Sequence, residues 1–326
     1  MKKSLHPSTS FFTGRLALLA AAALVFIIIS VQAEASSPRI AFGQWRGKES
    51  SVGYYENGAS HTLIKRNAAD PEISPNGNQI AFTLHGENGS RTIALCSIPN
   101  GKITRLRVSG GNSYGPRWST DGKSLLYSKY VGGKRWLPAI YDIASGREKI
   151  ITPEKGRAPA PNDLFSPFFS ADGKSFWAQD MTNLYQFSLD GAQQTVIALD
   201  PLFAKEKILG GSDIHFTQSA DGENIIFAVQ IGETHCRICQ NPDCRSGVFI
   251  YNIKTGKLTN IPLKTICVQR ASWLAGSTDE LLLVLHSAVQ KRTASPNIND
   301  ICIYSIKAGK IISTPVKNAY DASSSR

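Results

Sequence analysis

Six polar side chains of types that can bind anions or transfer protons lie on predicted innermost strands, or in the loops that enter them, and are expected near the mouth of a central channel. They are Asp70, Glu72, Arg117, Asp213, His215 and Arg270. An arginine pair beside an imidazole could bind a carboxylated sugar, and a sugar lyase needs such a base flanked by cations. The alternative is that these residues are solvated lining of a channel, and we assign no catalytic residue.

The histidines predict no metal site, and no cofactor is expected. A site built from several histidines would need them close together in the fold. The five histidines beyond the N-terminal segment are instead scattered along the chain, at His61, His85, His215, His235 and His286.

The segment Gly111-Asn112-Ser113-Tyr114-Gly115 matches the Gly-x-Ser-x-Gly pattern of serine hydrolases. In those enzymes the serine stands on a sharp turn between a buried strand and a helix. Here the motif falls in a predicted loop that runs into a strand, and no hydrolase domain follows. We therefore interpret it as a chance match.

Five of the six cysteines are predicted to gather on one face of the fold. They are Cys236, Cys239, Cys244, Cys267 and Cys302. In an exported protein an even number of cysteines favours disulfides, and each closed loop would add about 2–4 kcal/mol of stability. A zinc site completed by His235 or Cys267 is the alternative. Cys96 stands apart and is predicted to be a small buried apolar residue.

A short recurring phrase indicates which elements position these residues. Its copies are Ser119-Thr120-Asp121-Gly122, Ser170-Ala171-Asp172-Gly173, Ser219-Ala220-Asp221-Gly222 and the looser Ser74-Pro75-Asn76-Gly77. The four glycines are 45, 51 and 49 residues apart, and a near-constant period of that size indicates a repeat architecture. Asp-Gly between two apolar runs predicts a hairpin, and we expect a type I′ turn with positive φ at both central residues.

Each repeat contains four short predicted strands, as at 114–118, 124–128, 138–143 and 149–151. Residues 39–64 supply only three strands, and the chain after Thr314 is the natural source of the fourth. Small sheets of this kind cover one another when they stack radially. We therefore predict an all-β fold, a six-bladed β-propeller of four-stranded antiparallel blades whose first blade is completed by a C-terminal strand. No helix is expected after the N-terminal segment.

The run from Pro116 to Lys123, followed by Ile140-Tyr141-Asp142-Ile143-Ala144-Ser145-Gly146, resembles the propeller repeat of the TolB family. Ile250 to Gly256 matches the second half of that repeat, and the resemblance covers residues 38–315. It implies a TolB-like propeller with envelope proteins as partners, such as peptidoglycan-associated lipoproteins. TolB proteins carry an α/β domain ahead of the propeller, and we expect this chain to lack it.

The N-terminal segment has the pattern of a secretory signal peptide. Three cations precede an uncharged apolar run from Leu16 to Ile29, and small residues offer cleavage near Ala33 or Ala35. An uncleaved membrane anchor is the alternative. Cleavage would lower the formal charge from +11 to +8, with no transmembrane domain expected in the remainder. Such a surface suits acidic partners, but no basic run exceeds two residues there, so nucleic acid is not expected.

Three of the tryptophans, Trp118, Trp177 and Trp273, stand in predicted strands and are expected in the core between sheets. Trp45 and Trp136 stand in loop-rich stretches beside arginines. These two could belong to an exposed binding face, with structural packing as the alternative.

The predicted organisation is a signal peptide over 1–35, a propeller over 36–318 and a polar C-terminal tail over 319–326. We predict an exported, periplasmic or secreted, monomeric and non-enzymatic scaffold with an envelope protein as partner. The alternative is a propeller that binds or cleaves an acidic glycan at the mouth of its central channel. Because the repeated turns occupy one end of the ring, functional residues are expected in the loops at the other end.

Overall fold

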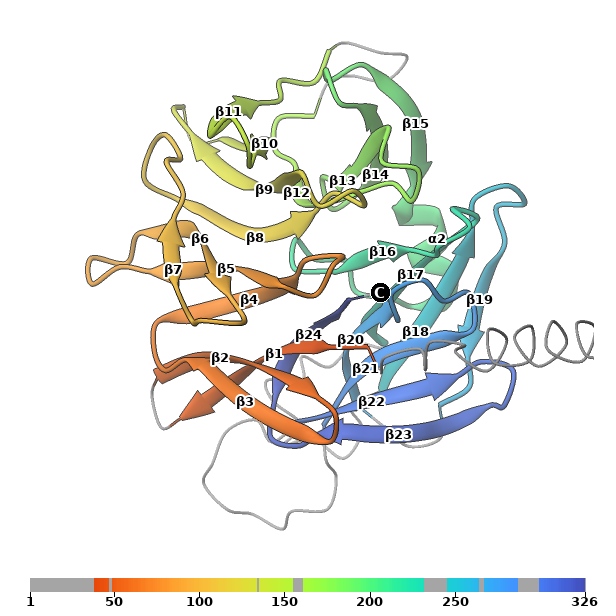
Figure 1. Cartoon of the computed structure of the whole chain (residues 1–326). Helices are drawn as coiled ribbons and strands as arrows, with labels where there is room; N and C mark the ends of the chain where they lie inside the picture. Colours follow the sequence, from red (N-terminus) through yellow and green to blue (C-terminus); the bar gives the residue numbers. More distant parts are fainter. Residues whose placement is uncertain are drawn as a thin grey trace, which may run out of the picture. The chain divides into compact units, whose positions relative to one another are not determined.

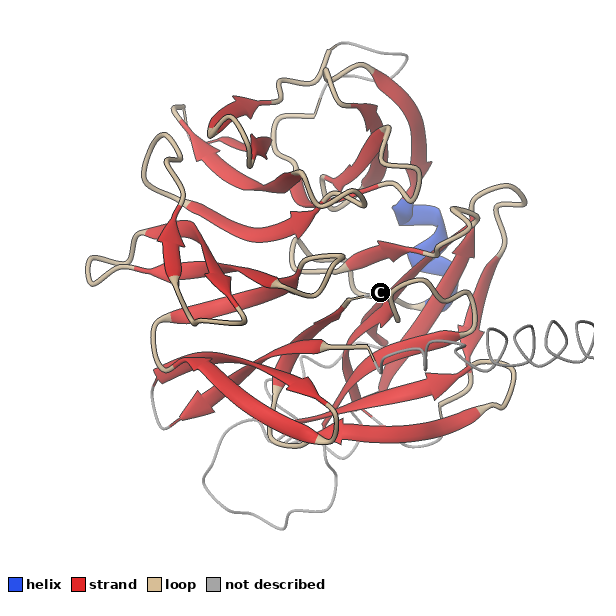
Figure 2. Cartoon of the chain, in the orientation of Figure 1, coloured by secondary structure: helices blue, strands red, loops and turns tan. Residues whose placement is uncertain are grey.

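The computed structural model describes residues 38–46, 49–133, 135–154, 161–231, 245–263, 267–286 and 299–325. These residues form six four-stranded antiparallel sheets arranged as the blades of a ring (Figure 1). Figure 2 shows that the described residues are mostly strand. The predicted six-bladed propeller is therefore confirmed. The predicted signal peptide lies outside the described residues.

The blades follow one another along the chain. Blade 1 contains β24 (Tyr320–Ser324), β1 (Ile40–Arg46), β2 (Glu49–Glu56) and β3 (Ala59–Ile64), and blade 2 contains β4 (Ala68–Ile73), β5 (Gln79–His85), β6 (Arg91–Ser97) and β7 (Ile103–Arg105). Blade 3 contains β8 (Ser113–Trp118), β9 (Ser124–Val131), β10 (Arg135–Asp142) and β11 (Arg147–Ile150), and blade 4 contains β12 (Phe165–Phe169), β13 (Ser175–Gln179), β14 (Asn183–Ser188) and β15 (Gln193–Ala198). Blade 5 contains β16 (Phe216–Gln218), β17 (Asn224–Ile231), β18 (Arg245–Asn252) and β19 (Leu258–Ile261), and blade 6 contains β20 (Cys267–Trp273), β21 (Glu280–His286), β22 (Asn299–Ser305) and β23 (Lys310–Val316).

The C-terminal strand closes the ring, as the sequence predicts. β24 pairs with β1, and Ser323 also accepts a hydrogen bond at its Oγ from the backbone N of Ile73 in blade 2, at 2.9 Å. This corrects the predicted polar tail over 319–326, because those residues contain β24. Ala322, Ser323 and Ser324 carry small side chains, which suit a strand at the narrow centre of the ring.

The repeated Ser-x-Asp-Gly phrase forms the turn between the first two strands of a blade, but not as a type I′ turn. The backbone N of Gly122 donates to Ser119 O at 2.9 Å, so the turn is centred on Thr120 and Asp121. Of these residues only Gly122 has positive φ, 69°. This corrects the predicted turn type: the hairpin is a β-turn followed by a left-handed glycine, and Asp121 Oδ1 accepts from the backbone N of Lys123 at 3.0 Å.

The hydrophobic core is divided into six layers, one between each pair of adjacent blades. The three tryptophans expected in the core are confirmed there, since Trp118 and Trp273 are 8% exposed and Trp177 is 1% exposed. Burying a large apolar side chain in such a layer contributes roughly 1.5–3 kcal/mol. The apolar contacts thus lie between blades, and the centre of the ring is left to the innermost strands.

Helix α2 (Leu199–Glu206) connects blades 4 and 5 and was not predicted. Leu199 and Phe203 are buried, and the Phe203 ring contacts that of Phe227 at a centroid distance of 5.8 Å. The helix has eight residues, about two turns, which is too short to show a helical period in the sequence. Within the described ranges, no helix is long and apolar enough to cross a membrane.

Candidate functional site

The innermost strands carry a recurrent β-bulge close to their beginnings. The pairing register shifts across residues 69–72 in β4, 114–117 in β8 and 165–168 in β12, and again in the pairing of β24 with β1. Asp70, Gly115, Ser166 and Asp321 have positive φ at these points, of 51°, 67°, 48° and 54°. A bulge redirects the side chains of its strand, and all four residues line a cavity at the centre of the ring.

This cavity, which we call the mouth, lies at the end of the channel where the innermost strands begin and has a volume of about 450 Å³. Five of the six predicted channel residues line it, namely Asp70, Arg117, Asp213, His215 and Arg270. The structure therefore brings together side chains that are up to 200 residues apart in the sequence. Whether they bind a ligand stays a prediction.

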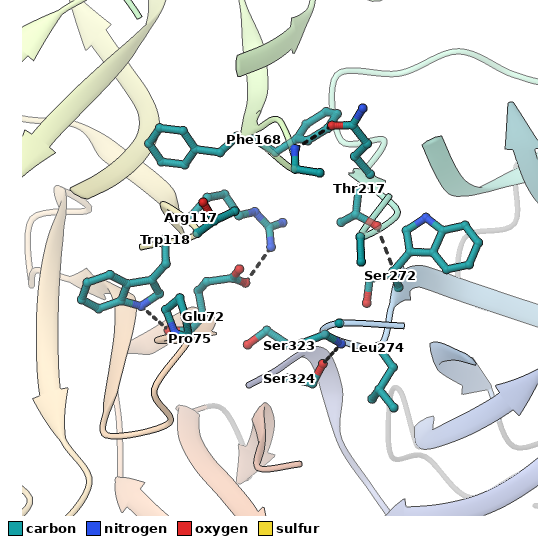
Figure 3. Close-up of a pocket in the computed structure, with 18 of the residues that line it drawn as sticks. Glu72, Pro75, Arg117, Trp118, Phe168, Thr217, Ser272, Leu274, Ser323 and Ser324 are labelled. Carbon is teal, nitrogen blue, oxygen red and sulfur yellow. Dashed lines mark hydrogen bonds and ion pairs between the residues drawn. The ribbon is translucent and has the colours of Figure 1, made fainter. Parts of the chain in front are cut away.

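The sixth predicted residue, Glu72, lines a second cavity of about 200 Å³ at the end where the Ser-x-Asp-Gly turns lie. Glu72 Oε2 and Arg117 Nη1 form an ion pair of 2.8 Å, and Figure 3 shows the two side chains pointing toward one another. Arg117 lines both cavities. It therefore belongs to a waist between the two ends of the channel.

His215 completes the waist, between two arginines. Arg117 Nη2 is 2.8 Å from His215 Nε2, and Arg270 Nη2 is 2.6 Å from His215 Nδ1. Burial, together with the charges of the two arginines, holds the pKa of His215 well below its usual 6.5. A neutral imidazole accepts a hydrogen bond at only one nitrogen, so the two guanidinium groups compete for it.

Each arginine of the waist has a carboxylate partner. Arg117 pairs with Glu72, and Arg270 Nη1 pairs with Asp321 Oδ1 on the closing strand. Burial raises the pKa of Glu72, whereas burial and the charge of Arg117 lower the pKa of Arg270 to about 9. The waist is therefore a compact network of nearly balanced charge that links blades 2, 3, 5 and 6 to the C-terminal strand.

Aromatic side chains gather around Arg91 at one side of the mouth. The guanidinium carbon of Arg91 is 4.4 Å from the Tyr114 ring centroid and 5.5 Å from that of Trp136. Tyr130 packs on Trp136 at 5.2 Å, and Arg91 Nε donates to Asn112 Oδ1 at 2.7 Å. Cation–π contacts of this kind fix an arginine without neutralising its charge. We call these five residues the Arg91 cluster.

A second aromatic pair involves Tyr320, which lines the mouth. The ring of Trp45 stacks on that of Tyr320 at a centroid distance of 5.3 Å, and Trp45 is 50% exposed. Gly43 permits this arrangement, because a Cβ there would lie 2.7 Å from the Tyr320 ring. Burial raises the pKa of Tyr320 to about 12, so its hydroxyl is protonated at neutral pH.

The comparisons with known proteins agree with this architecture. No family model matches the chain. A protein TolB homolog of Chlorobium chlorochromatii is 23% identical over 197 residues, which are 60% of this chain and 40% of that protein. A Tol-Pal system protein TolB of Francisella tularensis is 36% identical over 80 residues, 23% of this chain and 17% of that protein.

A crystal structure of TolB from Acinetobacter baumannii superposes with a TM-score of 0.59 at 16% identity, over 98% of this chain and 74% of that one. The chain is a TolB-like β-propeller. The predicted resemblance is thus confirmed. The matches span 40% or less of the length of these two curated relatives.

Several mouth residues of the TolB-like propeller escaped prediction. They are Arg91, Tyr114, Gln269, Tyr320 and Asp321. The sequence does contain a signal for the bulges. Asp70, Gly115 and Ser166 are each followed by proline. They are 45 and 51 residues apart, which is the spacing of the turn glycines Gly77, Gly122 and Gly173. Asp321 carries no such mark, and only the pairing of β24 brings it to Arg270.

The predicted cysteine cluster of the TolB-like propeller stays a prediction, because Cys236, Cys239 and Cys244 lie outside the described residues. Cys302 is buried in the layer between blades 5 and 6, with Sγ 3.4 Å from Thr314 Oγ1, and it forms no disulfide with another cysteine of the described residues. Cys96 is fully buried between blades 1 and 2, as expected of a small apolar residue.

Proposed function

We propose that this chain is an exported protein-interaction module of the cell envelope that binds a protein partner at the mouth of its channel. The observation that carries the proposal is the half-exposed Trp45 on Tyr320, together with the Arg91 cluster, beside a polar cavity. Tryptophan, tyrosine and arginine are the residues most enriched among the hot spots of protein interfaces.

Exposed apolar side chains near the mouth further support a protein partner. Met181 and Leu209 are 46% and 40% exposed, in connections at the same end of the ring as the mouth. The two connections lie close to each other and to the mouth. The backbone O of Met181 is 3.6 Å from the point where a Cβ on Gly210 would lie, and Gly210 comes two residues before Ser212, which lines the mouth. An apolar and aromatic surface around a charged centre is the arrangement of many protein interfaces.

The names of the relatives favour the same class of function. One carries the name Tol-Pal system protein TolB, and we propose a role for this chain in an envelope system of that kind. A periplasmic location is part of the proposal, supported by the signal-peptide pattern of residues 1–35.

Binding of an acidic glycan is the second candidate, favoured by the convergence of Arg117, Arg270 and His215 below a stacked aromatic pair. Both arginines, however, already hold carboxylates, and a uronic acid would have to displace Glu72 or Asp321. A protein partner needs no such displacement, which is why it ranks first. Calorimetry with uronic-acid oligomers distinguishes the two, because the glycan site predicts saturable binding that is lost in Arg117→Ala and Arg270→Ala.

Affinity capture from an envelope extract tests the docking proposal. Wild-type protein should retain a partner that Trp45→Ala and Trp136→Ala retain about 10–30-fold less, the range expected for hot-spot residues. Thr120→Ala, on an exposed residue at the opposite end of the ring, is the matched control and should retain the partner fully. Equal capture by all four proteins, at unchanged melting temperature, would reject the mouth as the docking surface.

A further inference from the structure

The outer strand of blade 2, β7, has an open edge. It pairs with β6 alone among the described strands, and Ile103, Thr104 and Arg105 are all exposed. Leu106 N donates to Ile93 O and Ser97 N donates to Lys102 O, each at 3.0 Å. Hydrogen-bonded and non-bonded pairs alternate in an antiparallel ladder, so the backbone N–H and C=O groups of Ile103 and Arg105 point away from β6.

Two grooves flank this edge. One, of about 790 Å³, lies between blades 1 and 2 and includes Ile103 and Arg105 in its lining. The other, of about 580 Å³, lies between blades 2 and 3 and includes Thr104 and Arg107. Side chains of a strand alternate between the two faces of its sheet. A strand added to β7 would therefore place its side chains alternately in the two grooves.

Both grooves are lined by cations. They are Lys65, Arg66, Lys102, Arg105 and Arg107. All five are exposed, and none forms an ion pair with a carboxylate of the described residues. Among those residues Glu87 is the one carboxylate in either lining. The edge thus combines open backbone groups with an excess of four positive charges.

We propose that β7 binds an acidic, extended segment of a partner protein as a fifth strand of blade 2. The backbone of the segment would bond to Ile103 and Arg105, and its carboxylates would enter the two cationic grooves. An anionic membrane would use the charges but not the edge. The location of the cations on both faces of one sheet edge, rather than on one flat surface, favours a strand. This surface is separate from the mouth and does not rest on the function proposed there.

Fluorescence anisotropy with a labelled peptide that repeats Glu-Glu-Thr-Thr tests the inference, because this repeat places glutamates on both faces of the added strand. Ile103→Pro removes one outward N–H and keeps every cation, and proline is tolerated at a strand edge of this kind. Lys102→Gln with Arg105→Gln removes two cations and keeps the edge. We expect each variant to weaken binding about fivefold or more. Lys310→Gln, on the outer strand of blade 6, is the control and should bind within about twofold of wild type.

Three results would overturn the inference. One is failure of the wild-type protein to bind the peptide at low salt. Another is binding that falls with the double glutamine variant but not with Ile103→Pro, because charge alone would then explain it. The third is co-sedimentation with phosphatidylglycerol-containing vesicles, at a higher affinity than that for the peptide, which Ile103→Pro does not change. That result would assign the surface to a membrane. Melting temperatures of all variants check that the blade is intact.

Discussion

Replacing Lys129 by methionine tests how one side of the mouth is held in place. Lys129, on β9, is 2% exposed, and its Nζ lies 2.9 Å from Glu148 Oε1 on β11. Glu148 also accepts hydrogen bonds from the Tyr127 hydroxyl and from the backbone N of Ser109, the latter at 2.8 Å. Ser109 begins the short connection that carries Asn112 to the Arg91 cluster. The buried pair therefore supports both the blade and the rim of the mouth.

In Lys129→Met the Glu148 carboxylate stays buried without its cation. Removing one partner of a buried ion pair costs about 3–5 kcal/mol, which corresponds to a fall in melting temperature of roughly 6–20 °C. The double variant Lys129→Met with Glu148→Gln should recover part of this loss, because Glu148→Gln removes the unpaired charge and keeps an acceptor for the Tyr127 hydroxyl. Lys123→Met is the control, since its pair with Asp121 is 3.8 Å long and Lys123 is 77% exposed. It should cost less than about 1 kcal/mol.

Urea denaturation followed by circular dichroism measures these differences, and its pH dependence adds a second test. Although burial opposes ionisation, hydrogen bonds from Ser109, Tyr127 and Lys129 lower the pKa of Glu148 below its usual 4.5. The carboxylate therefore stabilises the fold above about pH 4.5, and that contribution is lost as the pH falls further. If Lys129→Met lowers the free energy of unfolding by no more than Lys123→Met does, the buried ion pair does not stabilise the fold.

Three further predictions concern the waist, the turns and the ring closure. The lowered pKa of His215 means that the native state resists protonation, so the free energy of unfolding should fall below about pH 6.5 by up to about 1.4 kcal/mol per pH unit. His215→Gln should remove that slope in denaturation series across this pH range. Gly122→Ala should cost about 1–2 kcal/mol in thermal denaturation, because φ is 69° there while the nearest atom, Pro75 Cδ, leaves room for a methyl group at 3.6 Å. Deleting residues 319–326 should abolish the cooperative unfolding transition in calorimetry, and the missing peptide added in trans should restore part of it.

The fold was largely predictable because its signals are local. Asp121-Gly122 and its copies mark the first hairpin of each repeat, and alternating apolar runs mark the strands that follow. The turn type was mistaken because the Asp121 side chain acts as an acceptor for backbone N–H groups, which the dipeptide alone does not reveal. The missing fourth strand of blade 1 was placed correctly because residues 39–64 supply three strands where every other repeat supplies four.

The candidate site was predictable only in part. Asp70, His215 and Arg270 each stand three residues before the end of their strand, and Glu72 and Arg117 each stand one residue before it, so the repeat alone brings them to the channel. Asp321 reaches Arg270 only through the register of β24 with β1 and the bulge within it, which depends on tertiary pairing. Trp45 is half exposed because Tyr320 and Gly43 provide a surface for its ring, a contact between opposite ends of the chain.

Photo-crosslinking in intact cells tests the central claim, that partners bind at the mouth rather than at the turn end of the ring. A photoreactive amino acid would replace Trp45 or Trp136 near the mouth, and Thr120 or Ala220 at the turns; of these, Trp45, Thr120 and Ala220 are exposed. We predict that positions 45 and 136 crosslink to the same envelope protein and that positions 120 and 220 do not. Crosslinks to that protein from the turn positions alone, or equally from both ends, would contradict the account.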